Sequence, residues 1–158
     1  MKTTNAIGLD NNKAKLLAEK LNELLANYSV FYQNTRGSHW NVKGEKFFEL
    51  HLKFEELYND LLFQIDEVAE RILTLGYSPN HNFSDYARVS KIPESKKVTD
   101  GVESVVNILE SFKTIIPLQR ELLSQSAETG DEGTYALKTD YISAKQRLVW
   151  IYSAFLNK

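Results

Sequence analysis

The 158-residue sequence predicts an all-α protein built as a bundle of four long helices with one short additional helix. Three observations favour this class. Apolar residues recur at spacings of three and four through long stretches rich in Leu, Glu, Lys, Ala and Gln. Most of the three prolines and seven glycines lie between these stretches, and no alternating apolar and polar run typical of a strand occurs. The length fits a single domain spanning residues 1–158, and residues 1–10 are expected to form a flexible N-terminal tail.

The first two helices are expected over residues 11–39 and 45–75. In the first, Leu17, Leu21 and Leu24 recur as one buried helix face should. The second is stopped by Gly76 and then Pro79, a pattern typical of a helix end.

Residues 77–98 form a connection that is too long for a simple turn, and Ser84-Asp85-Tyr86 could cap a short helix inside it. A third helix is expected over residues 99–127, with a kink at Pro117. A fourth is expected over residues 134–155. Four long helices with one long crossover between the second and third correspond to a ferritin-like four-helix bundle.

Composition excludes several classes of protein. Hydrophobic residues make up 42% and charged residues 25%, which argues against a disordered, collagenous or membrane-embedded chain. The absence of cysteine removes disulfides, thiolate metal sites and cysteine nucleophiles. The N-terminus lacks the apolar region of a secretory signal, and the longest apolar run, residues 148–156, is about half of a membrane span. We therefore expect a soluble cytoplasmic protein.

The second helix has two apolar faces when its residues are placed at about 100° intervals. One face is expected to pack in the bundle core: Phe47, Leu50, Phe54, Leu57, Leu61, Ile65, Val68, Ile72 and Leu75. The other holds Phe48, Leu52, Leu62, Phe63, Ala69 and Leu73. A single bundle needs only the first face, so the second indicates that another subunit covers this helix.

His51, Glu55, Asp66 and Glu70 lie within that second face, where a charge is costly unless it is paired or binds a metal. Carboxylates with an imidazole suit iron, manganese or zinc. His51 and Asp66 are about 22 Å apart along the helix. They can therefore meet only between two copies packed antiparallel, with His39, His51 and Glu55 of one subunit facing Asp66 and Glu70 of the other.

A metal site inside the bundle is not expected. Ferritin-like di-iron bundles place Glu-x-x-His pairs on their inner faces, and none of the three histidines follows a glutamate at that spacing.

The segments HWNVKG (39–44), FFELHLKFE (47–55), DEVAER (66–71) and LG (75–76) resemble the Dps family, the DNA-binding proteins from starved cells or mini-ferritins. The resemblance implies a hollow dodecamer with the short helix at a two-fold interface. It also implies a ferroxidase centre formed by His39, His51 and Glu55 of one subunit with Asp66 and Glu70 of another. Glu55 departs from the family, which most often has Asp there.

The resemblance further implies that Fe(II) is oxidised, typically by hydrogen peroxide, and that Fe(III) is stored as mineral in the shell. Trp40 is then a candidate radical trap, and Asp131, Glu132 and Asp140 are candidates for an acidic pore that attracts cations. The alternatives are a packing role for Trp40, a helix N-terminus for the three acids, and plain interface ion pairs for the carboxylates on the second helix.

DNA compaction by a structural nucleoid protein is the alternative function. Family members that bind DNA usually do so through a basic tail, but residues 1–12 contain only Lys2, offset by Asp10. Twelve copies with a formal charge of −2 give a shell of about −24, which repels phosphate. We therefore expect weak or no DNA binding. A third interpretation is a helical shell without metal chemistry.

Overall fold

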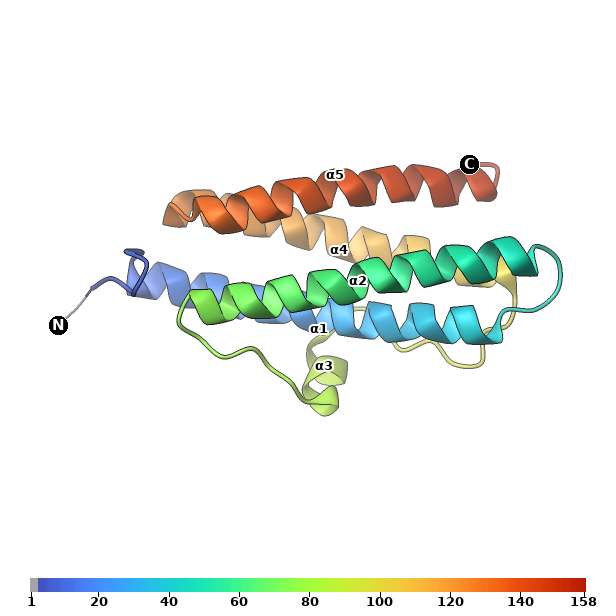
Figure 1. Cartoon of the computed structure of the whole chain (residues 1–158), viewed down its shortest axis with the longest axis horizontal. Coiled ribbons are helices and arrows are strands. Elements are labelled where there is room, and N and C mark those ends of the chain that lie inside the picture. The colour runs from blue at the N-terminus through green and yellow to red at the C-terminus, as the bar shows by residue number, and fades with distance from the viewer. Residues whose placement is uncertain (1–2) are drawn as a thin grey trace.

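The computed structural model describes residues 3–158 and contains five helices, with no strand in that range (Figure 1). The helices are α1 (Asn11–Asn41), α2 (Phe47–Thr74), α3 (Phe83–Val89), α4 (Gly101–Thr129) and α5 (Glu132–Phe155). The four long helices form the bundle, and α3 lies in the long connection between α2 and α4. The predicted all-α, ferritin-like bundle with a short fifth helix is confirmed. Within the described residues, no helix is long and apolar enough to cross a membrane.

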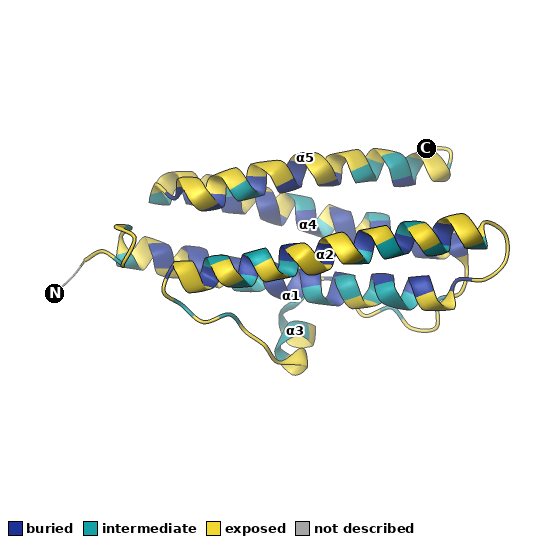
Figure 2. Ribbon diagram, in the orientation of Figure 1, coloured by how far each residue is buried: buried dark blue, intermediate teal, exposed yellow. Residues whose placement is uncertain are grey.

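The core lies along the axis of the bundle, where each long helix turns its apolar stripe inward (Figure 2). Leu17, Leu21 and Leu24 of α1 are fully buried, as their spacing predicts. The rings of Phe31 and Phe112 meet edge to face across α1 and α4, with centroids 5.2 Å apart. Each such side chain contributes about 1.5–3 kcal/mol on burial, so this stripe holds the helices together.

The predicted core face of α2 is also confirmed. Seven of its residues are buried: Leu50, Phe54, Leu57, Leu61, Val68, Ile72 and Leu75. Phe47 and Ile65 are partly buried against the same core. The opposite face of α2 is therefore left for other contacts.

Three of the long helices begin at an aspartate whose side chain accepts a hydrogen bond from a backbone amide in the first turn. These are Asp10 for α1, Asp100 for α4 and Asp131 for α5. Such a cap satisfies one of the amides that a helix start leaves unpaired. Helix α4 continues through Pro117 to Gly130, whose left-handed backbone (φ 76°) ends it. The predicted kink at Pro117 stays a prediction.

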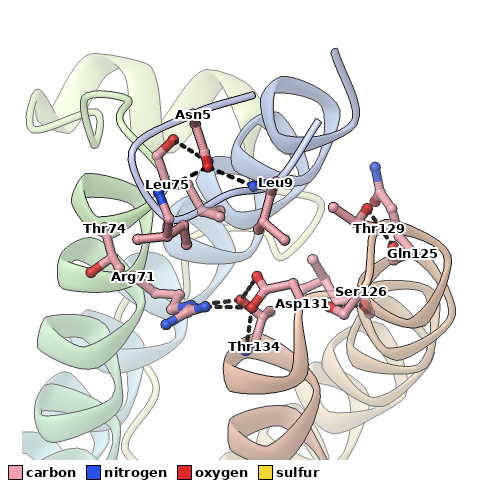
Figure 3. Close-up of polar contacts among 12 residues, drawn as sticks. Asn5, Leu9, Arg71, Thr74, Leu75, Gln125, Ser126, Thr129, Asp131 and Thr134 are labelled. Atoms are coloured by element: carbon pink, nitrogen blue, oxygen red, sulfur yellow. Dashed lines mark hydrogen bonds and ion pairs between the residues drawn. The ribbon is translucent and has the colours of Figure 1, made fainter. Parts of the chain in front are cut away.

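The N-terminal segment folds back onto the end of α2 (Figure 3). Asn5 Nδ2 donates to the carbonyl of Leu75 at 3.3 Å, and Asn5 Oδ1 accepts from the amide of Leu9 at 2.9 Å. Residues 1 and 2 lie outside the described part of the chain. The flexible tail over residues 1–10 stays a prediction.

Three asparagines of α1 hold the long connection in place. Asn22 accepts from the amide of residue 80 at 2.8 Å, and Asn34 accepts from that of residue 95 at 2.9 Å. Asn27 is fully buried and accepts from the amide of residue 91 at 2.9 Å. Sequence reasoning missed these contacts, because each asparagine reaches about sixty residues along the chain. They fix the position of α3 beside α1.

Candidate metal centre

His39 and His51 form a reciprocal pair at the junction of α1 and α2. His39 Nδ1 lies 2.6 Å from the backbone oxygen of His51, and His51 Nδ1 lies 2.7 Å from the backbone oxygen of His39. A carbonyl oxygen can only accept, so each Nδ1 carries the hydrogen and donates it. In a neutral imidazole this leaves the lone pair on Nε2, the arrangement that prepares histidine to bind a metal.

Neighbouring rings hold the two imidazoles in position. The rings of His39 and His51 stack at 3.7 Å between centroids with an interplanar angle of 16°. Phe47 also stacks against His51, at 5.0 Å between centroids, and Tyr58 packs edge-on against His39 at 5.3 Å. Both histidines are thus oriented before any ligand arrives, which is what precise metal binding requires.

The carboxylates are distributed along α2. Glu55 is half-buried and lies one helical turn beyond His51, on the same face. Asp66 and Glu70 are exposed and lie about 22 Å or more beyond His51 along the axis. Within residues 3–158, no three His, Asp or Glu side chains of one chain gather as a metal-binding group. One protomer thus brings the two histidines together, with Glu55 on the next turn, and keeps Asp66 and Glu70 apart from them.

The second apolar face of α2 is exposed in the protomer. Phe48 is 82% exposed and Phe63 is 63% exposed, and Leu52, Leu62 and Leu73 are also exposed. Figure 2 shows exposed positions repeating along α2. Contiguous apolar surface of this kind marks an interaction site, and the candidate carboxylates lie among these residues.

A groove of about 720 Å³ opens beside this face, between α1, α3 and the connection. Leu62 and Ile65 of α2, Phe83 and Tyr86 of α3, and Trp40 of α1 contribute to its wall. The ring of Trp40 is exposed and lies under the guanidinium of Arg36, 4.7 Å from its centroid. Trp40 is therefore exposed and oriented by Arg36 rather than packed in the core.

The three candidate pore residues have different surroundings. Asp131 is 2% exposed, forms an ion pair with Arg71 and accepts from the amide of Thr134 at 3.1 Å (Figure 3). The structure thus gives Asp131 a role inside the protomer, as a helix cap paired to α2. Glu132 and Asp140 are exposed on α5.

Sequence reasoning missed the partner of Asp131. Arg71 follows Glu70 on α2, and its guanidinium crosses to the start of α5. A Cβ atom at Gly133 would lie 2.7 Å from Arg71 Nη2, so glycine leaves room for this crossing. The only available signal was Gly133 itself, just before the helix expected over residues 134–155, and a glycine there does not identify what occupies the space.

A four-helix bundle with a long crossover, and with His51 and several carboxylates on its second helix, is the arrangement of a ferritin-like protein. Consistent with this, the ferritin-like domain family matches residues 18–158.

Known proteins narrow the class further. The DNA protection during starvation protein of Porphyromonas gingivalis is 36% identical over 151 residues, covering 96% of this chain and 95% of the relative. That of Brevibacillus brevis is 32% identical, with coverage of 90% and 96%. The crystal structure of the Dps protein from Vibrio cholerae O1, a member of the ferritin-like diiron-carboxylate superfamily, superposes with a TM-score of 0.97 at 51% identity, covering 99% and 98%. The chain belongs to the Dps family.

Proposed function

We propose that the protein binds Fe(II) at sites shared between two subunits, oxidises it, and stores Fe(III) as mineral inside a hollow shell, which protects the cell from oxidative damage. The observation that carries the proposal is the His39–His51 pair, in which both Nδ1 atoms are used by backbone carbonyls and both Nε2 atoms keep their lone pairs. Membership of a family with diiron-carboxylate relatives favours iron as the substrate.

Each site would take His39, His51 and Glu55 from one subunit, with Asp66 and Glu70 of the partner subunit. Two copies of α2 packed antiparallel about a two-fold axis bring these groups together twice. The exposed Phe48 and Phe63 on the same face supply the apolar surface that such a contact buries. A dodecameric shell and a cytoplasmic location are part of this proposal.

The proposed reaction uses hydrogen peroxide: two Fe(II) and one H₂O₂, with two protons, give two Fe(III) and two water molecules. Both electrons reach one peroxide, so no hydroxyl radical is released. In this reaction the histidines and carboxylates hold the two metal ions close enough to deliver their electrons together. Trp40, exposed beside His39, is proposed to intercept radicals that escape, and Glu132 and Asp140 to attract cations to a pore.

A mixing experiment tests the shared site. His51→Ala and Asp66→Ala proteins are each expected to oxidise anaerobically loaded Fe(II) slowly after a peroxide pulse, followed by ferric absorbance. When the two variants are unfolded together and reassembled at equal amounts, half of the two-fold pairs contain one copy of each. One of the two sites in such a pair is intact, so about a quarter of the wild-type rate should return.

Two outcomes would contradict the proposal. No recovery in the reassembled mixture would place the site within one chain, and a wild-type rate in both single variants would remove these residues from the chemistry. His81→Ala is the matched control, because His81 is exposed on the long connection and lies outside the proposed site.

DNA binding is expected to be weak, because the protomer carries a formal charge of −2 and its first twelve residues contain a single lysine. A gel shift of the iron-free protein against duplex DNA in low salt tests this. Strong retardation would make DNA compaction a leading function despite the acidic shell.

A further inference from the structure

Long polar side chains join α2 to α5 along much of the bundle, and we call this contact the α2–α5 seam. From one end to the other, its four contacts join Arg71 to Thr134, Glu67 to Tyr141, Gln64 to Lys145, and the backbone oxygen of Lys53 to Tyr152. The two helices run antiparallel, so the residue numbers fall on α2 as they rise on α5. The seam lies on the side of α2 away from its exposed apolar face.

Two lysines of α5 are enclosed behind this seam. Lys138 and Lys145 are both 0% exposed. Lys145 Nζ donates to Gln64 Oε1, whereas Lys138 Nζ has no hydrogen-bond partner within residues 3–158. Lys138 Nζ lies 4.6 Å from the ring centroid of Tyr141, and Lys145 Nζ lies 5.2 Å from that of Tyr28. A lysine is almost never fully buried without a paired charge, so two in one cluster need an explanation.

The groups that face these amines offer little compensating charge. The phenol of Tyr28 on α1 has a pKa raised by burial, as does that of Tyr141 on α5, so both stay neutral. On α2, Glu67 accepts from the Tyr141 hydroxyl, and Asp60 accepts from Gln64 at 2.7 Å. Helix α4 contributes Gln119, a neutral amide bonded to Tyr28. Neither carboxylate forms an ion pair with Lys138 or Lys145.

The protonated amines are therefore disfavoured in the folded protein. Burial, reinforced by the charge of Lys145, lowers the pKa of Lys138 to about 7. Burial lowers the pKa of Lys145 to about 8, despite the opposing effect of Asp60. In the unfolded chain a lysine keeps a pKa near about 10.4, so folding releases protons from this pair between roughly pH 7 and pH 10.

We propose that the contact between α2 and α5 is sensitive to acid: when the two enclosed lysines become charged, α5 loosens from α2. The aromatic rings of Tyr28 and Tyr141 partly stabilise the charged amines by cation–π contacts. They do not replace a carboxylate, and Lys138 has no acceptor to retain it. The proposal concerns how α5 packs against α2, and it does not depend on iron being the substrate.

The number of protons that the protein takes up on unfolding tests whether the enclosed lysines are uncharged in the folded state. Denaturant unfolding of the assembled protein, at one protein concentration across pH 6.5–9.5, gives this number from the slope of the unfolding free energy against pH. These two groups should contribute about two protons near pH 9, and Lys138→Met should remove about one of them. Methionine matches the lysine stem, and Lys138 Nζ makes no hydrogen bond that the variant would lose.

Amide hydrogen exchange shows which helix loosens when the pH falls. In the wild type, protection of the α5 amides should fall at pH 6.5 relative to pH 8.5 after correction for intrinsic exchange, whereas in Lys138→Met the fall should be clearly smaller. Lys145→Met provides a second variant if the first does not fold. Lys15→Met, at an exposed position on α1, is the matched control and should behave like the wild type. An unchanged proton count in Lys138→Met, or α5 protection independent of pH in the wild type, would overturn the proposal.

Discussion

His39 and His51 orient each other through backbone atoms and not through their rings alone: each Nδ1 donates to the other residue's carbonyl oxygen, at 2.6 and 2.7 Å. Since the acceptors belong to the main chain, replacing one imidazole leaves the hydrogen bond of the other intact. The two histidines can therefore be tested one at a time as metal ligands.

His51→Ala should weaken metal binding without unfolding the protomer. The variant loses one Nε2 donor, while His39 keeps its bond to the carbonyl of residue 51. We expect affinity for Fe(II), measured anaerobically by calorimetry, to fall by roughly 10-fold or more, with unchanged helix content by circular dichroism. An unchanged affinity would show that the His51 imidazole is not a metal ligand.

Arg71→Ala should destabilise the protein by about 3 kcal/mol. The substitution leaves the buried carboxylate of Asp131 without its guanidinium partner, and breaking a buried pair in this way is strongly unfavourable. Chemical denaturation of the variant and of wild type measures the difference. A loss of only a few tenths of a kcal/mol would mean that water replaces the guanidinium at Asp131.

Gly133→Ala should have opposite effects in two backgrounds. In the wild type, the new Cβ would lie 2.7 Å from Arg71 Nη2, so a cost of about 1–3 kcal/mol is expected. In Arg71→Ala the space is free, and alanine in a helix should then stabilise by about 0.5–1 kcal/mol. Denaturation of the four proteins in this cycle measures both effects, and equal costs in the two backgrounds would rule out the steric explanation.

Asn27→Ala should destabilise the long connection by about 2 kcal/mol, because it removes the buried Asn27 side chain, whose Oδ1 accepts from the amides of residues 91 and 92. Asn22→Ala is the control: Asn22 is partly exposed, water can replace it, and the cost should stay below about 1 kcal/mol. Limited proteolysis within residues 77–98 reports the loosening directly. Similar cleavage rates for the two variants would contradict the special role of Asn27.

Phe63→Asp should prevent assembly while leaving the protomer folded. Phe63 is 63% exposed, so a charge there costs the protomer little, but it would be buried in the proposed contact between two α2 helices. Light scattering should give a smaller mass, with unchanged helix content by circular dichroism. A full-sized shell would place the subunit contact on another face.

The periodicity of the sequence was sufficient by itself to predict the features that depend only on residues within the same helix. A repeat of 3.6 residues specifies which side chains share a face, so the helix ranges, the core stripe of α2 and its second apolar face followed from spacing alone. Placing His51 and Glu55 on one face needed no knowledge of the rest of the chain.

Only the tertiary structure decided which groups meet across helices. Arg71 and Asp131 are sixty residues apart, and a pattern of acids before a helix is equally typical of an exposed start. The burial of Lys138 and Lys145 was also not predictable, because lysine in an amphipathic helix normally faces water. Helical spacing describes one helix at a time, whereas burial and pairing depend on what the other helices place opposite it.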